Sequence, residues 1–530
     1  MNYPGFYAAL FRATLPETAL EVAALLVLIV DLGFLLKAAL ITRVAIAAFV
    51  GVAGCAAALA LLPYVGSSGL QFGDELLLSS GGTAAIAQTG ILVLTILTLL
   101  LFVGSTFTRH ASEYVSVVLM AAAGGLIVAA AQDLLVIFVG LELLSLGLYI
   151  LTAFAKNSGK SAEAAMKYYL FGGMSAAFLL FGFSYLYGLS GSTNLAHVIR
   201  GTYLSAANGA TPLLLVALVM IAVGLGFKVA AVPFHLWAPD TYEGAPAPGA
   251  AFIASVSKVA SFALLISISH AILWWPAMLH MKGHVTLSVA GPGAPLPHMT
   301  YGFVSGWPLI LMLLSAASMV VGNLAALAQT SVRRLLAYSA IAHAGYILPG
   351  LAFFGWSNLS AQAILYYILT YGLTTIGAFG VVGVVERATG SDRLDSFLGL
   401  HKRNPLLAAV LLVLFLSLAG IPPLVGFWAK FNLFAAVLTL GSGPSPVPWP
   451  LSSLPTNALA LVVLALAFSA VSLYYYLQVL KRAYVMPAID ETPIKAHPVT
   501  LAVLLAIAAA VVVFGCFPSL LQNWIASFYR

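Results

Sequence analysis

Charged residues are scarce in this sequence of 530 residues. Asp, Glu, Lys and Arg make up 7% of it and hydrophobic residues 62%, whereas about a quarter of the residues in soluble domains are charged. Such a chain cannot cover itself with a hydrated surface, so most of its exterior must face lipid. The net charge of +6 would fit an acidic partner or nucleic acid, but the distribution of the basic residues, given below, indicates membrane topology instead.

Cysteine and the common cofactor motifs are equally scarce. The two cysteines, Cys55 and Cys516, each lie inside an apolar run and are interpreted as small core residues, since two thiols cannot build a four-thiolate iron–sulfur or zinc site. There is no phosphate-binding glycine loop, no dinucleotide fingerprint and no nucleophile elbow. No cleavable signal peptide is evident. The sequence therefore predicts that this chain binds no cofactor or metal.

Long apolar runs fill the sequence from end to end. A helix needs roughly 20 apolar residues to cross the hydrocarbon core of a bilayer. The runs predict one integral membrane domain over residues 1–530, all-α, with about fourteen transmembrane helices. We expect these at 18–36, 44–62, 84–104, 114–131, 133–154, 165–188, 212–237, 248–271, 307–328, 334–355, 359–385, 404–440, 457–480 and 498–518.

The basic residues in the loops support an even number of spans. With the N-terminus outside, the inner loops carry most of the Lys and Arg, as the positive-inside rule requires. An odd number of helices would move some loops to the opposite side of the membrane and remove this bias. The number is therefore even, and both termini are predicted outside. The inner residues are Lys37, Arg43, Arg109, Lys156, Lys160, Arg333, Arg334, Arg387, Arg393, Lys402, Arg403, Lys481, Arg482 and Lys495, and the outer ones are Arg12, Arg200, Lys282 and Arg530.

Two of the predicted spans are interrupted by proline. The run 404–440 would exceed about 50 Å as one helix, and Pro422 and Pro423 inside it should break it just before Lys430. In the run 212–237, Pro233 follows Lys228 by five residues. Helices broken at membrane depth line cavities or are buried in protein, and transporters often contain them in pairs.

The interruptions fall in the seventh and twelfth spans and predict an inverted repeat. Five is an odd number, so a five-helix unit would be inverted in the membrane when it recurs. We expect helices 4–8 (residues 111–271) and helices 9–13 (residues 305–482) to form the two repeats, with helices 1–3 in residues 1–110 and helix 14 at 498–518. This expectation rests on topology, because Lys228 precedes its proline whereas Lys430 follows.

Ionisable side chains inside the apolar spans are the candidate functional residues. Such a group costs roughly 2.5–3.5 kcal/mol near mid-bilayer, so it needs a partner, water or a role in proton transfer. Burial disfavours the charged form of lysine and a nearby carboxylate favours it. The candidates are Glu142, Lys167, Lys228, Lys258, His343 and Lys430. The sequence predicts that Glu142 pairs with Lys228, and that their separation sends the proton to Lys258 and then to Lys430, with His343 as a relay.

Structural roles are the alternative for each candidate. Lys167 lies near a helix end and could extend to the interface. The three deeper lysines could form purely structural ion pairs, and His343 could be a hydrogen-bonded packing residue.

Four acids outside the candidate set are given structural interpretations. Asp240 and Glu243 lie in a Pro/Gly-rich turn and are interpreted as helix caps. Glu17 and Asp31, in or near the first helix, are expected to face a partner or the interface.

Four segments resemble one known family. They are LELLSLGLYIL at 141–151, KVAAVPFHLWAPDTYEGAPAP at 228–248, SVRRLLAYSAIAHAGYIL at 331–348 and LAGIPPLVGFWAKFNLF at 418–434. They resemble the antiporter-like membrane subunits of respiratory complex I, NADH:quinone oxidoreductase, and among these the N type. The M type usually has a glutamate where Lys430 stands, and the L type continues into a long lateral helix, whereas this sequence ends at Arg530.

The resemblance implies a subunit of a proton-translocating enzyme. By it, Glu142 and Lys228 match the helix-5 and helix-7 pair, Lys258 the central lysine and Lys430 the lysine of the broken twelfth helix. It implies no redox centre in this chain, with NADH, FMN, iron–sulfur clusters and quinone in partner subunits. The implied partners are subunits of the K, M, L, A, J and H types and the lipid bilayer of a bacterial cytoplasmic (inner) membrane, without nucleic acid.

Two other functions fit the same residues. One is a subunit of an Mrp-like Na⁺/H⁺ antiporter that works without redox input. The other is a non-pumping membrane scaffold whose lysines bind anionic lipid or hold helices together.

Overall fold

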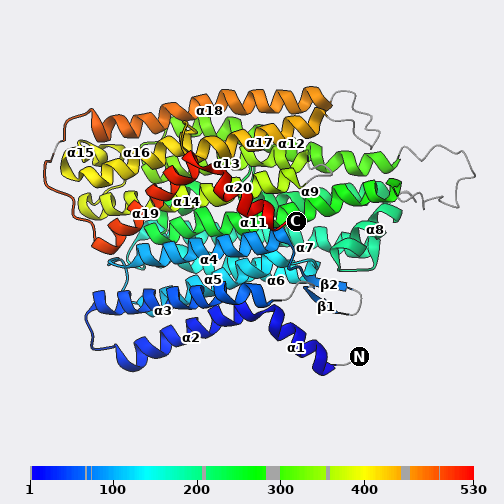
Figure 1. Cartoon of the computed structure of the whole chain (residues 1–530), viewed down its shortest axis with the longest axis horizontal. Coiled ribbons are helices and arrows are strands. Elements are labelled where there is room, and N and C mark those ends of the chain that lie inside the picture. The colour runs from blue at the N-terminus through cyan, green and yellow to red at the C-terminus, as the bar shows by residue number, and fades with distance from the viewer. Residues whose placement is uncertain are drawn as a thin grey trace, which may run out of the picture.

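Long helices that run side by side build almost the whole molecule (Figure 1). This computed structural model describes residues 3–65, 69–72, 75–205, 210–281, 299–353, 358–442, 454–488 and 490–529. Lys282 and Arg530, two of the predicted outer charges, lie outside these ranges. The all-helical membrane fold expected from the apolar runs is confirmed.

The first helices form one side of the molecule, and a small hairpin that the sequence did not predict joins them. Helix α2 packs against α3 and α5, and α1 meets α2 at a bend of 72°. The strands β1 and β2 pair antiparallel. The bounds are α1 Tyr3–Ala13, α2 Leu15–Phe34, α3 Leu40–Leu61, the 3₁₀ turn Leu62–Tyr64, β1 Leu70–Phe72, β2 Glu75–Leu78 and α4 Gly82–Phe102.

The middle of the chain contains the deeply buried helix α11. It packs against α4, α5, α13 and α14, and 94% of its membrane segment is buried inside the protein. The elements of this part are α5 Ala111–Ala130, α6 Leu134–Thr152, α7 Gly159–Ser190, α8 Leu195–Ser205, α9 Thr211–Val229, α10 Trp237–Gly244 and α11 Ala247–Met281.

The last part repeats this order of long and interrupted helices. Here α13 is as deeply buried as α11 and α14 is 83% buried, whereas α18 and α19 lie at the outside. The elements are α12 Met299–Leu327, α13 Val332–Ala352, α14 Leu359–Thr389, the 3₁₀ turn Leu394–Phe397, α15 Leu400–Arg403, α16 Pro405–Ala419, α17 Val425–Ser442, α18 Leu454–Tyr484, α19 Pro498–Cys516 and α20 Pro518–Ser527.

Both predicted interruptions are present. Helix α9 ends at Val229 and α10 begins at Trp237, while α16 ends at Ala419 and α17 begins at Val425. The helix before each interruption, α9 or α16, is followed by a residue in the left-handed backbone conformation. These residues are Ala230 with φ +58° and Gly420 with φ +87°.

The number of spans depends on how these pairs are counted. Among the described residues, 12 helices are long and apolar enough to cross a membrane, or 13 if α1 and α2 count as one bent span. Helices α16 and α17 are each too short alone. The prediction of fourteen crossings counts this interrupted pair as one.

Two short backbone bridges occupy matching places in the middle and last parts of the chain. Asp133, just before α6, bridges to Asn194, just after α7, and Ser331, just before α13, bridges to Arg393, just after α14. Each bridge is made by two backbone hydrogen bonds of 2.8 or 2.9 Å. The first lies beside the β hairpin and the second near α15, at opposite ends of the molecule in Figure 1.

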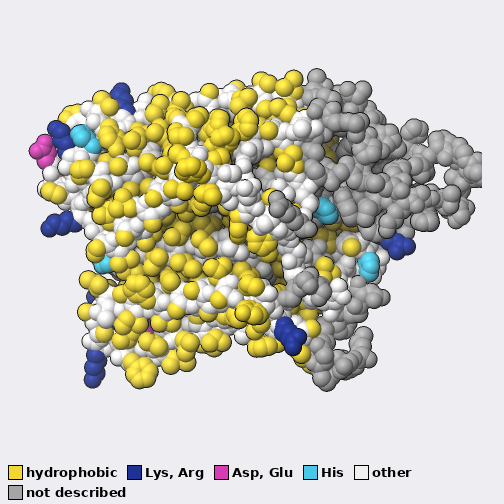
Figure 2. Space-filling view, in the orientation of Figure 1, with side chains coloured by type: hydrophobic (Ala, Val, Ile, Leu, Met, Phe, Trp, Pro, Cys, Tyr) yellow, Lys and Arg dark blue, Asp and Glu magenta, His cyan; other side chains and the backbone are white. Residues whose placement is uncertain are grey.

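Loops with basic residues meet at one end of the molecule, which we call the basic end. Arg387 Nη1 donates to Gly104 O at 2.8 Å, and Arg403 Nε donates to Thr492 O at 3.2 Å. These contacts join the α4–α5, α14–α16 and α18–α19 connections. Figure 2 shows dark blue side chains at this end, beside a surface covered mainly by hydrophobic side chains.

Glu17 and Asp31 of α2 lie inside the protein, so their expected position facing a partner or the interface is wrong, whereas the third acid of this helix, Glu21, is exposed. Asp31 is 1% exposed and accepts hydrogen bonds from Arg43 at 2.7 and 2.6 Å and from Ser112 Oγ at 2.6 Å. Glu17 is 3% exposed. The polar partners of Asp31 come from α3 and α5, which the sequence alone could not place beside α2.

The close contact of α17 with α16 gives a first prediction. A Cβ at Gly426 would lie 1.8 Å from the Ser417 carbonyl oxygen, so Gly426→Val should destabilise the protein by about 1–3 kcal/mol or more. Thermal unfolding of the purified protein would show a lower midpoint. Gly173→Val on α7 is the control, because no atom lies within 4 Å of its Cβ position. Equal midpoints for the two variants would contradict the packing described.

Candidate functional site

Lys228 lies in the last turn of α9, directly before the first interruption. Its side chain is buried, and Nζ donates to Ser145 Oγ in α6. The break beside it is fixed by neighbouring helices: the Val232 amide donates to Ser318 Oγ of α12 at 2.9 Å, and Trp237 Nε1 donates to Phe227 O at 2.9 Å. The break therefore holds Lys228 against α6.

Glu142 lies one turn before Ser145 on α6. It is half-buried and close enough to interact electrostatically with Lys228. Within the described residues, however, its carboxylate has no hydrogen bond and no ion pair. The predicted pair is thus near but not in contact in this conformation, and Ser145 stands between its members as the acceptor for Lys228.

Lys258 lies about a third of the way along α11 and is 4% exposed. Its Nζ donates to the backbone oxygen of Ala340 in α13 and lies 5.5 Å from the centre of the Tyr371 ring in α14. An ammonium group over an aromatic face gains electrostatic stabilisation, more so when it is desolvated. Three buried helices therefore enclose Lys258, and none of the carboxylates in the described ranges contacts it.

His343 lies on α13 between two lysines. Its ring is 4% exposed and interacts electrostatically with both Lys258 and Lys430. Nδ1 lies 2.8 Å from the Tyr367 hydroxyl and Nε2 lies 3.4 Å from the Tyr476 hydroxyl. A neutral imidazole offers one donor and one acceptor, so these two hydroxyls can complete its hydrogen bonding.

Lys430 lies in the second turn of α17, just after the second interruption. Nζ donates to Leu418 O at 3.3 Å and Ala419 O at 2.9 Å, and to Ser469 Oγ of α18 at 2.8 Å. The first two acceptors are terminal carbonyls of α16. Such carbonyls have no partner within their own helix and form the negative end of its dipole, so the break itself creates a binding site for the lysine.

These residues form two clusters in the protein interior. One contains Glu142 and Lys228, and the other contains Lys258, His343 and Lys430. We call the five together the buried row. In the described part of the chain no hydrogen bond joins the two clusters directly.

Lys167 lies away from the buried row. Its Nζ pairs with Glu163 at 2.7 Å and with Asp240 at 2.8 Å, and its side chain is 42% exposed. Arg334 of α13 pairs with Asp240 at 2.6 Å and with Glu243 at 3.0 Å. These ion pairs form a surface charge cluster that joins α7, α10 and α13.

The charge cluster corrects the interpretation of Asp240 and Glu243 as helix caps. Both acids instead bind basic side chains from other helices. Burial would raise the pKa of the Asp240 carboxyl, but the hydrogen bonds from Lys167 and Arg334 outweigh it and hold that pKa below its usual range.

Several partners in the buried row were not predicted from the sequence. Ser145 could have been found, because it follows Glu142 by three residues and so lies on the same face of α6. No sequence pattern predicts the contacts of Ser469, Tyr367 and Tyr476, because their partners lie in distant segments of the chain. Among the described residues, no three His, Cys, Asp or Glu side chains are grouped so that they could hold a metal ion.

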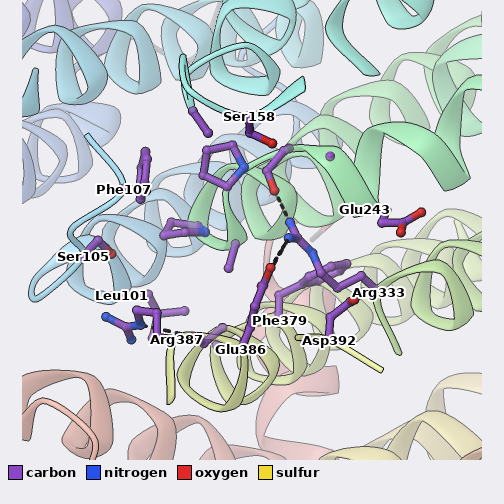
Figure 3. Close-up of a pocket in the computed structure, with 18 of the residues that line it drawn as sticks. Leu101, Ser105, Phe107, Ser158, Glu243, Arg333, Phe379, Glu386, Arg387 and Asp392 are labelled. Carbon is purple, nitrogen blue, oxygen red and sulfur yellow. Dashed lines mark hydrogen bonds and ion pairs between the residues drawn. The ribbon is translucent and has the colours of Figure 1, made fainter. Parts of the chain in front are cut away.

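A polar cavity of about 350 Å³ opens at the basic end, and we call it the basic-end cavity. In Figure 3, Arg333 bonds both Glu386 and a backbone oxygen. The distance from Arg333 Nη1 to each Glu386 carboxylate oxygen is 3.2 Å, and the backbone oxygen belongs to Ala245. The turn before α11, Gly244 to Pro248, forms another part of the lining.

Buried hydroxyls lie between this cavity and Lys258. Tyr242 packs against Phe379, a lining residue, with ring centres 5.7 Å apart, and it interacts electrostatically with Tyr371 below Lys258. Among the described residues, the hydroxyl of Tyr242 has no protein hydrogen-bond partner, whereas the Thr375 hydroxyl, one turn beyond Tyr371, interacts with the Tyr371 hydroxyl. Buried polar groups of this kind usually bind ordered water.

The charge cluster gives a second prediction. Because the pKa of Asp240 is depressed in the folded protein, its contribution to stability is complete above the ordinary value of about 3.9 and is lost as the pH falls through the folded-state value. Asp240→Asn should therefore lower the thermal midpoint at pH 7, and its difference from the native protein should shrink below about pH 4.

Asp395→Asn is the matched control. Asp395 is 77% exposed and lies 3.7 Å from Arg482, so its removal should change the midpoint little. Equal effects of the two substitutions, or a difference that grows in acid, would contradict the role given to Asp240.

Comparison with known proteins agrees with the resemblance carried by the four segments. The sequence matches the family described as NADH:quinone oxidoreductase/Mrp antiporter, TM, over residues 131–294 and 285–443. NADH-quinone oxidoreductase subunit N 2 of Acidobacterium capsulatum is 45% identical over 532 residues, which cover 98% of this chain and 99% of that protein.

Solved structures share the fold. A chain of respiratory complex I from Thermus thermophilus with bound aureothin is 33% identical, with a TM-score of 0.72 over 96% of this chain and 98% of that one. A chain of the Mrp complex from Dietzia sp. DQ12-45-1b has a TM-score of 0.74 at 21% identity, over 97% and 96% of the two chains, and shows the shared fold alone. From the sequence match and the full-length relatives, this multi-pass membrane protein belongs to the NADH-quinone oxidoreductase subunit N family of antiporter-like membrane subunits.

Proposed function

We propose that this chain translocates protons in the membrane arm of an NADH:quinone oxidoreductase, driven by quinone reduction in other subunits. The observation that carries the proposal is the cluster of Lys258, His343 and Lys430 inside the protein. Two amines and an imidazole lie close enough to interact electrostatically, and none of them contacts a carboxylate in the described residues. Groups in this state can lose and regain a proton, whereas permanent ion pairs hold it.

Lys430 is the receiving end of the proposed path. Its ammonium form is stabilised by the two α16 carbonyls and Ser469, which are acceptors without a full charge. The site therefore attracts the protonated form without trapping it as a carboxylate would.

Glu142 and Lys228 form the control point of the proposed path. Approach of Glu142 would favour the charged form of Lys228, and withdrawal would release its proton. The observed conformation, with Ser145 as the acceptor for Lys228, corresponds to the separated state. We propose that Lys167 supports this region from outside, through its contact with Asp240 on α10.

The basic-end cavity is the proposed entrance. Its turn at Gly244–Pro248 leads directly into α11, and Lys258 follows Pro248 by ten residues, about 15 Å of helix. Tyr242 lies beside this route, where water bound to its hydroxyl would carry the proton to the lysine.

The bridges at Asp133–Asn194 and Ser331–Arg393 support the proposed inverted repeat. They close α6–α7 and α13–α14 at corresponding residues and at opposite ends. We place the two repeats at 111–271 and 305–482, preceded by residues 1–110 and followed by helix 14. The positive-inside rule then directs the basic end to the cytoplasm of a bacterium and both termini outward.

Redox chemistry belongs to other subunits under this proposal. NADH, FMN, iron–sulfur clusters and quinone would be bound there, and the K, M, L, A, J and H types are the proposed partners. An Mrp-like antiporter and a non-pumping scaffold are outcomes of the test that follows.

Substitution of the buried lysines tests the function. We expect Lys258→Gln and Lys430→Gln, each in the assembled complex in proteoliposomes, to lower coupled turnover about tenfold or more, because positioned proton transfer contributes about 10²–10⁴-fold. Lys402→Gln, an exposed lysine at the basic end, should leave turnover and pumping intact. Unchanged pumping in both buried variants favours the scaffold, and Na⁺-dependent proton exchange without NADH favours the antiporter.

Removal of one hydroxyl tests the entrance. Tyr242→Phe keeps the ring packing but removes the hydroxyl beside Tyr371, so proton delivery to Lys258 should slow and coupled turnover should fall several-fold. Tyr474→Phe is the control, since Tyr474 is 58% exposed. Equal turnover in the two variants would place the entrance elsewhere.

A further inference from the structure

An apolar crevice of about 530 Å³ lies between α4, α14, α19 and α20. Its wall on α4 extends from Thr89 to Leu97 and its wall on α19 from Ala506 to Phe514. Both stretches lie within the membrane spans Gly82–Phe102 and Pro498–Cys516. The crevice therefore opens toward hydrocarbon, on a molecule whose surface is largely hydrophobic (Figure 2).

The lining offers nothing to a polar ligand. Its two hydroxyl groups are engaged by their own helices: Thr89 Oγ1 donates to Ala85 O and Thr370 Oγ1 to Tyr366 O, both at 2.8 Å. The remaining lining residues are apolar side chains, Trp524 and Gly90. Apolar cavities of this kind stay free of water.

The dimensions indicate a narrow occupant. The walls on α4 and α19 each extend over eight residue steps, about 12 Å at 1.5 Å per residue. A volume of 530 Å³ over that length gives a width of roughly 7.5 Å, whereas a helix with its side chains measures about 10–12 Å across. A transmembrane helix of a partner does not fit, but an extended hydrocarbon chain does.

Helix α20 closes one end of the crevice, near the N-terminal end of α4. Leu520, Leu521 and Trp524 line it there, and the Tyr529 hydroxyl lies 2.7 Å from Thr83 Oγ1 at the start of α4. Trp and Tyr are enriched where a protein meets the polar layer of a bilayer. A chain in the crevice would therefore have its polar head near α20 and its tail toward mid-membrane.

We propose that this crevice is a specific binding site for one acyl chain of a membrane phospholipid. The chain packs on Leu369 and Leu373 of α14. The same helix presents Tyr367 and Tyr371 to His343, with Tyr367 hydroxyl to Nδ1 at 2.8 Å and ring centres of Tyr371 and His343 at 4.8 Å. The bound lipid supports the helix that positions these rings. The inference rests on the crevice and the membrane location, not on proton translocation.

The test uses the complete complex and a phospholipid with a photoreactive diazirine midway along its acyl chain. The complex is loaded in nanodiscs, exchanged into detergent to remove loosely held lipid, irradiated and mapped by mass spectrometry. We expect retained label on peptides containing 369–373 and 506–514. The exposed face of α18 at Leu459, Val463 and Leu466 should lose its label after the exchange.

Two neighbouring alanines on α19 give matched variants. Ala510 lines the crevice, so Ala510→Trp should fill it and lower the retained label about tenfold, the loss expected when two buried methylene groups are displaced. Ala509 is exposed and outside the lining, so Ala509→Trp should retain the native level. Thermal unfolding of both variants checks that each is folded.

Three results would overturn the proposal. One is the absence of label in the crevice of the native complex after exchange. Another is equal label in the Ala510→Trp and Ala509→Trp variants. The third is label that an isoprenoid quinone displaces but excess phospholipid does not, which would assign the crevice to a quinone tail.

Discussion

A backbone carbonyl or amide left unpaired in hydrocarbon costs several kcal/mol, and this constraint explains where two of the buried lysines lie. Prolines interrupt two helices and leave terminal carbonyls inside the protein. Lys430 satisfies two of those carbonyls, so the break and the ammonium group stabilise each other. At the other break, Ser318 and Trp237 satisfy the freed backbone, which leaves Lys228 directed toward α6. The same defect in a helix thus produces two different environments for lysine.

The burial of three central helices fixes the positions of the other residues in the site. Helices α11, α13 and α14 are enclosed by their neighbours, so Lys258 and His343 never meet lipid and the aromatic rings around them keep fixed positions. The charge cluster at Asp240 joins the first break to α13 from the surface, while the basic-end cavity connects the N-terminal end of α11 to solvent. A change at the α10 turn would therefore act on both the first interruption and the basic-end cavity.

Features with a local cause could be predicted from the sequence. Pro422 and Pro423 must end a helix, and a lysine in an apolar run must be buried, so the breaks and the buried row followed from residue chemistry. The acceptors did not, because Ser469 and Tyr476 reach the row only through packing of segments far apart in the chain. Asp31 was misplaced for the same reason: its partner Arg43 comes from α3. The hairpin at Leu70–Leu78 was missed because two short strands give too little alternation to detect.

Counted from the matching bridges at Asp133 and Ser331, Ser145 and His343 both stand twelve residues into their helices. The same position therefore carries a hydroxyl group in α6 and an imidazole in α13. A hydroxyl there exchanges one proton for another, whereas a neutral imidazole presents one nitrogen as donor and the other as acceptor and so can pass a proton between two neighbours. Under the proposed inverted repeat, corresponding positions would thus hold a hydroxyl in one half and a two-ended ring in the other. Because the two ring nitrogens of His343 reach Tyr367 of α14 and Tyr476 of α18, the imidazole connects two neighbouring helices at once.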